Sequence, residues 1–123
     1  YIKETCLRCH KEWNETEAVY AIDSVKNHIR GKMRKSEFWL SELIDKIVAG
    51  KKAGLPEEAL AQALEQHQKA HIYWEWWTAE NSDGFHNPEA ARESLTRSVE
   101  ESRKGIKLVD EALALLAPKG GKP

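Results

Sequence analysis

Cysteine, proline and glycine are scarce in this sequence, and long apolar runs are missing. The 123 residues include 2 cysteines, 4 prolines and 7 glycines. A structural zinc site takes four ligands, usually from two cysteine pairs, and two cysteines cannot supply them. No apolar stretch approaches the ~20 residues of a membrane span, so we expect a chain that does not cross a membrane.

An excess of one charge is also missing. The chain has 19 Lys and Arg against 20 Asp and Glu, a net charge of −1. This balance gives no reason to expect nucleic acid or a lipid surface as a partner. The length suits one domain with a single core. The sequence opens at Tyr1 without a signal peptide, and Cys6 follows so soon that we expect these residues to belong to a longer protein.

Glycine and proline mark two breaks in the chain. The run from Gly50 to Pro56 predicts a helix end, a short connection and a new helix. The run 81–88 predicts the same, with Asn87 as the N-cap and Pro88 as the first helical residue. The sequence thus predicts a first segment over residues 1–12, helices over 13–50, 56–81 and 88–117, and a disordered tail over 118–123.

Apolar residues recur every three or four positions in the first and last predicted helices, as in amphipathic helices. The first contains Ile22, Val25, Ile29, Met33, Leu40, Leu43 and Ile47, with Ser36 in the one gap. The last contains Leu95, Val99, Ser102, Ile106, Val109, Leu113 and Leu116. The predicted fold class is all-α, an elongated bundle of three long helices of about 45 Å each. Stripes this narrow are typical of coiled-coil seams, so we expect some to face a second copy or a missing domain.

The middle predicted helix carries aromatic side chains on several faces. Its run from His71 to Trp77 places Trp74 and Trp77 on one side and Trp76 well away from them. A helix that is apolar nearly all round is buried nearly all round. We expect either a tightly packed core or an interface with protein or large cofactors outside this sequence.

The strongest chemical signal is Cys6-Leu7-Arg8-Cys9-His10. Two thiols at this spacing can form thioethers with the two vinyl groups of one haem, and the adjacent histidine binds the iron as the proximal ligand. A thioredoxin-like redox pair would follow a strand, which nothing here predicts, and a simple disulfide is the remaining alternative. We predict a covalent haem c near the N-terminus of the bundle, and hence assembly outside the cytoplasm.

A haem iron needs a second axial ligand unless it is open to substrate. The candidates are His28, His67, His71, His86 and Met33. His67 and His71 share one helix face, which is compatible with a metal pair, but packed core histidines are the stronger interpretation. His28 is expected to be an ordinary helix residue. His86 lies in the short loop within residues 84–88, whose frame would present its nitrogen rigidly, and we predict that it is an iron ligand.

Together these features resemble the C-terminal part of the pentahaem, ammonia-forming cytochrome c nitrite reductases. The resemblance covers essentially the whole chain, and its most specific part is the segment 71–88, which ends in Gly84-Phe85-His86-Asn87-Pro88. It implies a periplasmic enzyme that reduces nitrite to ammonia with six electrons and dimerises largely through long C-terminal helices. It further implies that Cys6 and Cys9 anchor the last haem, that His10 is its proximal ligand, and that His86 is the distal ligand of another haem.

Two features of that family are missing from the sequence. The substrate haem is usually held by a CxxCK motif, which does not occur here, and the residues around nitrite have no counterpart. We therefore expect no nitrite reduction by these residues alone. The parent protein is expected to use a quinol-linked or cytochrome electron donor, and the resemblance leaves open a calcium site within it. An independent monohaem electron carrier and a haem-free helical interaction module are the alternatives.

Overall fold

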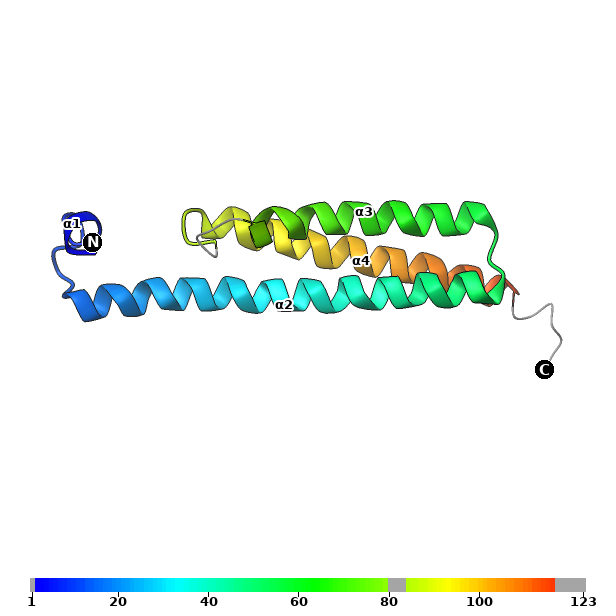
Figure 1. The fold of residues 1–123 in the computed structure, drawn as a ribbon, viewed down its shortest axis with the longest axis horizontal. Coiled ribbons are helices and arrows are strands. Elements are labelled where there is room, and N and C mark those ends of the chain that lie inside the picture. Colours follow the sequence, from blue (N-terminus) through cyan, green and yellow to red (C-terminus); the bar gives the residue numbers. More distant parts are fainter. Residues whose placement is uncertain (1, 80–83, 117–123) are drawn as a thin grey trace.

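The computed structural model describes residues 2–79 and 84–116. Within these ranges the chain forms α1 (Ile2–Thr5), α2 (Glu15–Ala53), α3 (Glu57–Ala79) and α4 (Pro88–Leu116). No strand occurs in these ranges, so the predicted all-α class is confirmed. Figure 1 shows α2, α3 and α4 alongside one another, with α1 over the N-terminal end of α2. None of the described helices is long and apolar enough to cross a bilayer.

The break between α2 and α3 comes later than the glycine pattern suggested. Gly54, with φ of 88°, is the left-handed cap that ends α2, and its N–H bonds to the carbonyl of Lys51. Gly50 lies inside the helix, where an added Cβ would lie 2.6 Å from Leu55 Cδ1. Gly50 therefore permits close packing rather than ending the helix. The predicted tail over 118–123 lies outside the described residues.

The length of α2 determines where the cysteine segment lies. α2 has 39 residues, against 23 in α3 and 29 in α4, which corresponds to about 58 Å at 1.5 Å per residue. It begins with a capping box, in which Asn14 Oδ1 accepts from the Glu17 N–H and Glu17 Oε1 accepts from the Asn14 N–H. The N-terminal end of α2 extends beyond its two neighbours, and α1 lies over this overhang (Figure 1).

The core is narrow and has two apolar clusters with a polar layer between them. The cluster nearer the overhang contains Ile29, Met33, Trp77, Ala91 and Leu95. The other contains Leu55, Ala63 and Val109. Between them Ser36, Ser98 and Ser102 are fully buried. The hydroxyl oxygens of Ser36 and Ser98 are 2.6 Å apart, and Ser98 Oγ donates to the carbonyl of Ala70 at 2.7 Å.

The apolar stripe of α4 is used inside this chain. Leu95, Val99 and Val109 are buried, and α4 packs against both α2 and α3. Gly105 lets α2 approach closely, because a Cβ there would lie 2.7 Å from Leu43 Cδ1. The expectation that a stripe faces a second copy or a missing domain is therefore wrong for these buried residues of α4, since two neighbouring helices suffice to cover so narrow a seam. The homodimer itself stays a prediction.

The aromatic run of α3 is covered on one side only. Trp77 is buried in the first cluster, and Trp74 packs beside it while its Nε1 donates to Glu37 Oε2 at 3.1 Å. Trp76 and Ile72 are 69% and 60% exposed. A tightly packed core is thus the wrong interpretation for this outer side, which no described residue covers.

Candidate haem site

Residues 6–10 form one tight turn between α1 and α2. The backbone N–H of His10 donates to the carbonyl of Cys6 at 3.0 Å, and the N–H of Cys9 to the same carbonyl at 3.3 Å. Residues three and four positions apart in such a turn lie on one side of it. This geometry brings Cys6, Cys9 and His10 together.

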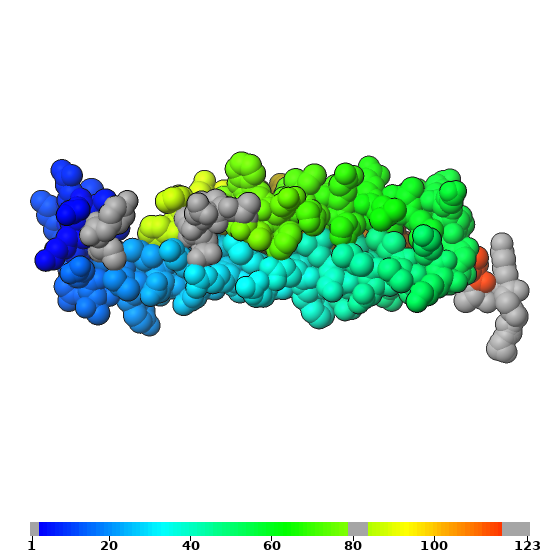
Figure 2. Space-filling view, in the orientation of Figure 1, coloured from blue at the N-terminus to red at the C-terminus, as the bar shows by residue number. Residues whose placement is uncertain are grey.

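A pocket of about 510 Å³ opens beside this turn, within the ~300–1,000 Å³ typical of ligand sites. Three parts of the chain line it: the N-terminal segment, the start of α2 and the turn before α4. The lining residues are Thr5, Cys6, Cys9, His10, Trp13, Ala18, Ala21, Ile22, Val25 and Phe85. Figure 2 shows the N-terminal segment and the start of α4 standing apart above α2.

The residues around this pocket fit a covalently bound haem. A haem c needs two thiols and an imidazole at one edge of an apolar cavity, and Cys6, Cys9 and His10 all line this one. Cys6 and Cys9 form no disulfide in this structure. Ile22 and Val25 belong to the predicted helix stripe but line the pocket, because α3 and α4 do not extend along the overhang of α2 to bury them (Figure 1).

His10 has two close neighbours within its own segment. Its imidazole stacks on the indole of Trp13, with ring centroids 4.5 Å apart and planes 11° from parallel. Its Nδ1 lies 3.6 Å from Glu12 Oε1. The His10 and Glu12 side chains are both mostly exposed, whereas Trp13 is half-buried against the pocket.

His86 lies in the turn that also carries Phe85. Asn87 Oδ1 accepts from the N–H of Ala90 at 3.2 Å, which confirms the predicted N-cap of α4. On the other side of His86, Gly84 has φ of 80°, a left-handed conformation that favours glycine. His86 is exposed, while Phe85 is half-buried and lines the pocket beside the cysteine turn. The fold therefore brings two distant candidate segments to the same end of the bundle, and iron ligation by His86 stays a prediction.

Comparison with known proteins identifies the family. The sequence profile of cytochrome c552 matches residues 1–120. The chain belongs to the cytochrome c552 family. It is also 41% identical over 63 residues to the cytochrome c nitrite reductase subunit NrfA of Nitratidesulfovibrio vulgaris (strain Hildenborough). That alignment covers 51% of this chain and 12% of the relative, so the chain spans a small part of that relative's length.

Membership of the cytochrome c552 family confirms the resemblance to cytochrome c nitrite reductases and implies haem c as the cofactor. Two aromatic residues of the pocket, Trp13 and Phe85, had not been predicted to line it. Trp13 falls outside the haem motif, and Phe85 was noted only as a neighbour of His86. An aromatic residue three positions after the motif histidine lies on the same side of a helical turn, and this spacing could have indicated Trp13.

The other candidate ligands lie on the bundle helices. Met33 is 7% exposed in the first core cluster, and His28 is exposed on α2. The rings of His67 and His71 are 5.9 Å apart, and His71 Nδ1 lies 3.3 Å from Glu75 Oε1. Burial, and then the nearby His71 charge, lowers the pKa of His67. Nowhere in residues 2–79 and 84–116 do three or more His, Cys, Asp or Glu side chains gather as a metal site.

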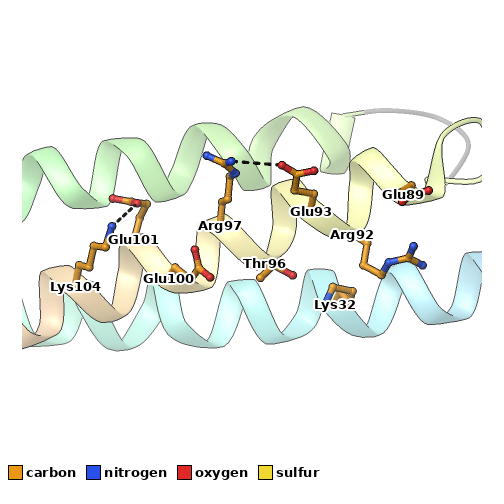
Figure 3. Close-up of a pocket in the computed structure, with 9 residues that line it drawn as sticks. All are labelled: Lys32, Glu89, Arg92, Glu93, Thr96, Arg97, Glu100, Glu101 and Lys104. Carbon is orange, nitrogen blue, oxygen red and sulfur yellow. Dashed lines mark hydrogen bonds and ion pairs between the residues drawn. The ribbon is translucent and has the colours of Figure 1, made fainter.

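A second depression, of about 690 Å³, runs along the outer face of α4 (Figure 3). Charged side chains of both signs line it, including the pairs Arg97–Glu93 at 3.4 Å and Lys104–Glu101 at 3.2 Å. The Arg97–Glu93 pair is exposed on both sides, and exposed pairs contribute little to stability. The depression has neither the thiols nor the apolar wall that a haem requires, and we interpret it as a solvated helix face.

Proposed function

We propose that this chain is the C-terminal part of a periplasmic, multihaem cytochrome c nitrite reductase, in which it holds one electron-relay haem. The observation that carries the proposal is the apolar pocket lined by Cys6, Cys9 and His10. Family membership supports haem c as its occupant. With no CxxCK motif in the sequence, the reduction of nitrite to ammonia belongs to other parts of the parent protein.

Each residue of the site has a defined role in this proposal. Cys6 and Cys9 would hold the haem, each thiol adding across one vinyl group, with sulfur bonded to one carbon and hydrogen to the other, so that no oxidant would be required. His10 would bind the iron through an imidazole nitrogen. The bound haem supplies one-electron transfer between ferric and ferrous iron. Ile22, Val25 and Phe85 exclude water from the pocket, which tunes the reduction potential through the local dielectric.

His86 is proposed as the distal ligand of a second haem, attached by a motif outside this sequence. Its exposure supports this role, as does the frame provided by Gly84 and the N-cap Asn87. Phe85, its neighbour, lines the first haem pocket. The two haems would therefore lie close together, as an electron relay requires.

The parent protein is proposed to be a homodimer that contacts itself through the long helices. Exposed apolar side chains on α2 support such a contact, since Phe38, Ile44 and Val48 are 45–56% exposed. Electrons would come from a quinol-linked or cytochrome donor, and the resemblance to the family leaves open a calcium site in the parent protein. Covalent haem attachment supports a periplasmic location.

The haem content of the full-length protein tests the proposal. After expression with c-type maturation, Cys6→Ala/Cys9→Ala should lose one covalent haem by mass spectrometry. His86→Ala should retain every haem but convert one low-spin signal to high spin in electron paramagnetic resonance. His28→Ala, at an exposed position of α2, is the control and should change neither. An unchanged haem count in the double cysteine variant would contradict the proposal, and a full-length protein with one haem would favour the independent electron carrier.

A further inference from the structure

Two residues beside His10, Glu12 and Trp13, have no role in the haem site described so far. The imidazole of His10 and the indole of Trp13 are nearly parallel, 11° apart, with centroids separated by 4.5 Å. The backbone N–H of Trp13 also donates to the backbone carbonyl of His10 at 3.2 Å. Backbone and ring contacts therefore hold Trp13 against one face of the imidazole.

Glu12 places a carboxylate near the nitrogen of His10 that iron would not use. Its Oε1 lies 3.6 Å from Nδ1, slightly longer than a hydrogen bond. A histidine that binds metal through one ring nitrogen almost always donates its other N–H to a carboxylate, a carbonyl or water. With Nδ1 facing Glu12, Nε2 is the nitrogen that remains for the iron.

Exposure makes the two contacts interdependent. The His10 and Glu12 side chains are 53% and 68% exposed, so water competes with Glu12 for the Nδ1–H. A ring that rotated freely would spend little time facing the carboxylate. The stack on Trp13 limits this rotation, since Trp13 is half-buried against the pocket wall.

We infer that Trp13 and Glu12 are positioning residues for the axial ligand His10. Trp13 holds the plane of the imidazole, and Glu12 would accept from Nδ1–H after a small approach from the present 3.6 Å and make the ring a stronger electron donor. A stronger donor stabilises ferric iron and lowers the reduction potential of the haem. Both roles depend on the proposed function, because they require a haem held by Cys6 and Cys9.

The test compares two variants of the full-length, haem-loaded protein that each remove one negative charge. Glu12→Gln removes the partner of His10, and Glu15→Gln is the control, at an exposed position in the first turn of α2. The haem of interest is the signal that disappears in Cys6→Ala/Cys9→Ala. We expect Glu12→Gln to destabilise its ferric state about tenfold, a rise of about 59 mV in midpoint potential, and Glu15→Gln to leave it nearly unchanged. Glu12→Asp should restore part of the lower potential.

The role of Trp13 has a spectroscopic test. Trp13→Ala should shift the low-spin g values of the same haem, because a freely rotating imidazole alters the ligand field, and Trp13→Phe should retain them. With the haem count intact, equal midpoint potentials in Glu12→Gln and Glu15→Gln would overturn the proposed role of Glu12. Unchanged g values in Trp13→Ala, again with the haem count intact, would overturn the proposed role of Trp13. Failure of the proposed function is distinguishable, since the double cysteine variant would then lose no haem.

Discussion

At the scale of single residues, the buried serines of the bundle differ in their hydrogen bonding. The one hydroxyl proton of Ser98 goes to the Ala70 carbonyl, so Ser36 must donate to Ser98 Oγ. Ser102 is equally buried, yet its hydroxyl makes no hydrogen bond to any described residue. A buried polar group left unsatisfied costs about 1–3 kcal/mol.

This contrast predicts opposite effects of two similar substitutions on α4. Ser98→Ala should lower the free energy of unfolding by about 1–3 kcal/mol, because Ser36 loses its acceptor. Ser102→Ala, in the next turn, should leave stability unchanged or raise it by up to about 1 kcal/mol, since it removes an unsatisfied hydroxyl and alanine favours helix. Urea denaturation followed by circular dichroism measures both. Equal destabilisation by the two substitutions would show that hydrogen bonding does not distinguish them.

His67 predicts a loss of stability in acid. Its pKa is lowered from 6.5 by burial and then by the nearby His71 charge, so the unfolded chain takes up a proton more readily than the folded chain. The contribution of neutral His67 to the free energy of unfolding is fully present above pH 6.5. It decreases as the pH falls from there toward the lowered pKa of His67. His67→Gln should therefore reduce the loss of stability measured between roughly pH 8 and pH 5. His28→Gln, at an exposed site, should retain it, and an unaltered profile in His67→Gln would refute the assignment.

At the scale of elements, the turn before α4 depends on Gly84. Its φ of 80° and its contact with α2 both exclude a side chain, because a Cβ would lie 2.7 Å from Ile29 Cγ2. Gly31, in the interior of α2, has nothing within 4 Å of the equivalent position. The two glycines thus form a matched pair, one required by the fold and one not.

Alanine substitution of these glycines should have effects of opposite sign. Gly84→Ala should destabilise the chain by more than about 1 kcal/mol and displace the turn that carries Phe85 and His86. Gly31→Ala should stabilise it by about 0.4–1 kcal/mol, because alanine favours helix and restricts the unfolded chain. Thermal denaturation measures the stability change. In the full-length protein, low-spin signals unchanged by Gly84→Ala would show that the turn does not position His86.

At the scale of the whole molecule, the candidate site lies at one end of an elongated bundle (Figures 1 and 2). The overhang of α2 brings the cysteine turn and the turn before α4 to the same pocket. Along α3, Leu64, Ile72 and Trp76 are 54–69% exposed. Apolar side chains gathered in this way mark a surface for other protein or for large cofactors, and the remainder of the parent protein is the proposed partner.

This surface predicts different effects in the full-length protein and in the present chain alone. Ile72→Ser/Trp76→Ser should alter the stability of the chain alone by no more than about 0.5 kcal/mol per site, because both side chains are exposed. In the full-length protein the double substitution should lower the free energy of unfolding by roughly 1.5–3 kcal/mol per side chain, because the rest of the protein is proposed to bury both. Melting temperatures measure the difference. Gln68→Ser, at an exposed position on α3, is the control, and equal effects in both proteins would show that this surface has no partner.

Local interactions made the helices and the haem motif predictable from the sequence. Asn87 and Pro88 begin α4 through contacts within one turn, and the apolar periodicity predicts helix without reference to any neighbour. The spacing of Cys6, Cys9 and His10 is likewise local, because thioether formation requires only two thiols in one turn. The prediction of where α2 ends was less accurate, because the sequence makes Gly50 and Gly54 equally plausible caps. Only the packing of Leu55 against Gly50 distinguishes them.

Tertiary structure alone decided which surfaces are covered. Ile29 and Ile22 belong to the same three- and four-residue spacing, yet Ile29 lies in the core and Ile22 in the pocket wall. The difference arises because neither α3 nor α4 extends as far as the start of α2 (Figure 1). It also determined that Trp77 is buried and Trp76 exposed, and that Phe85 meets the cysteine turn. Periodicity and capping act within about one turn of helix, whereas burial depends on the relative lengths and packing of helices that are distant in the sequence.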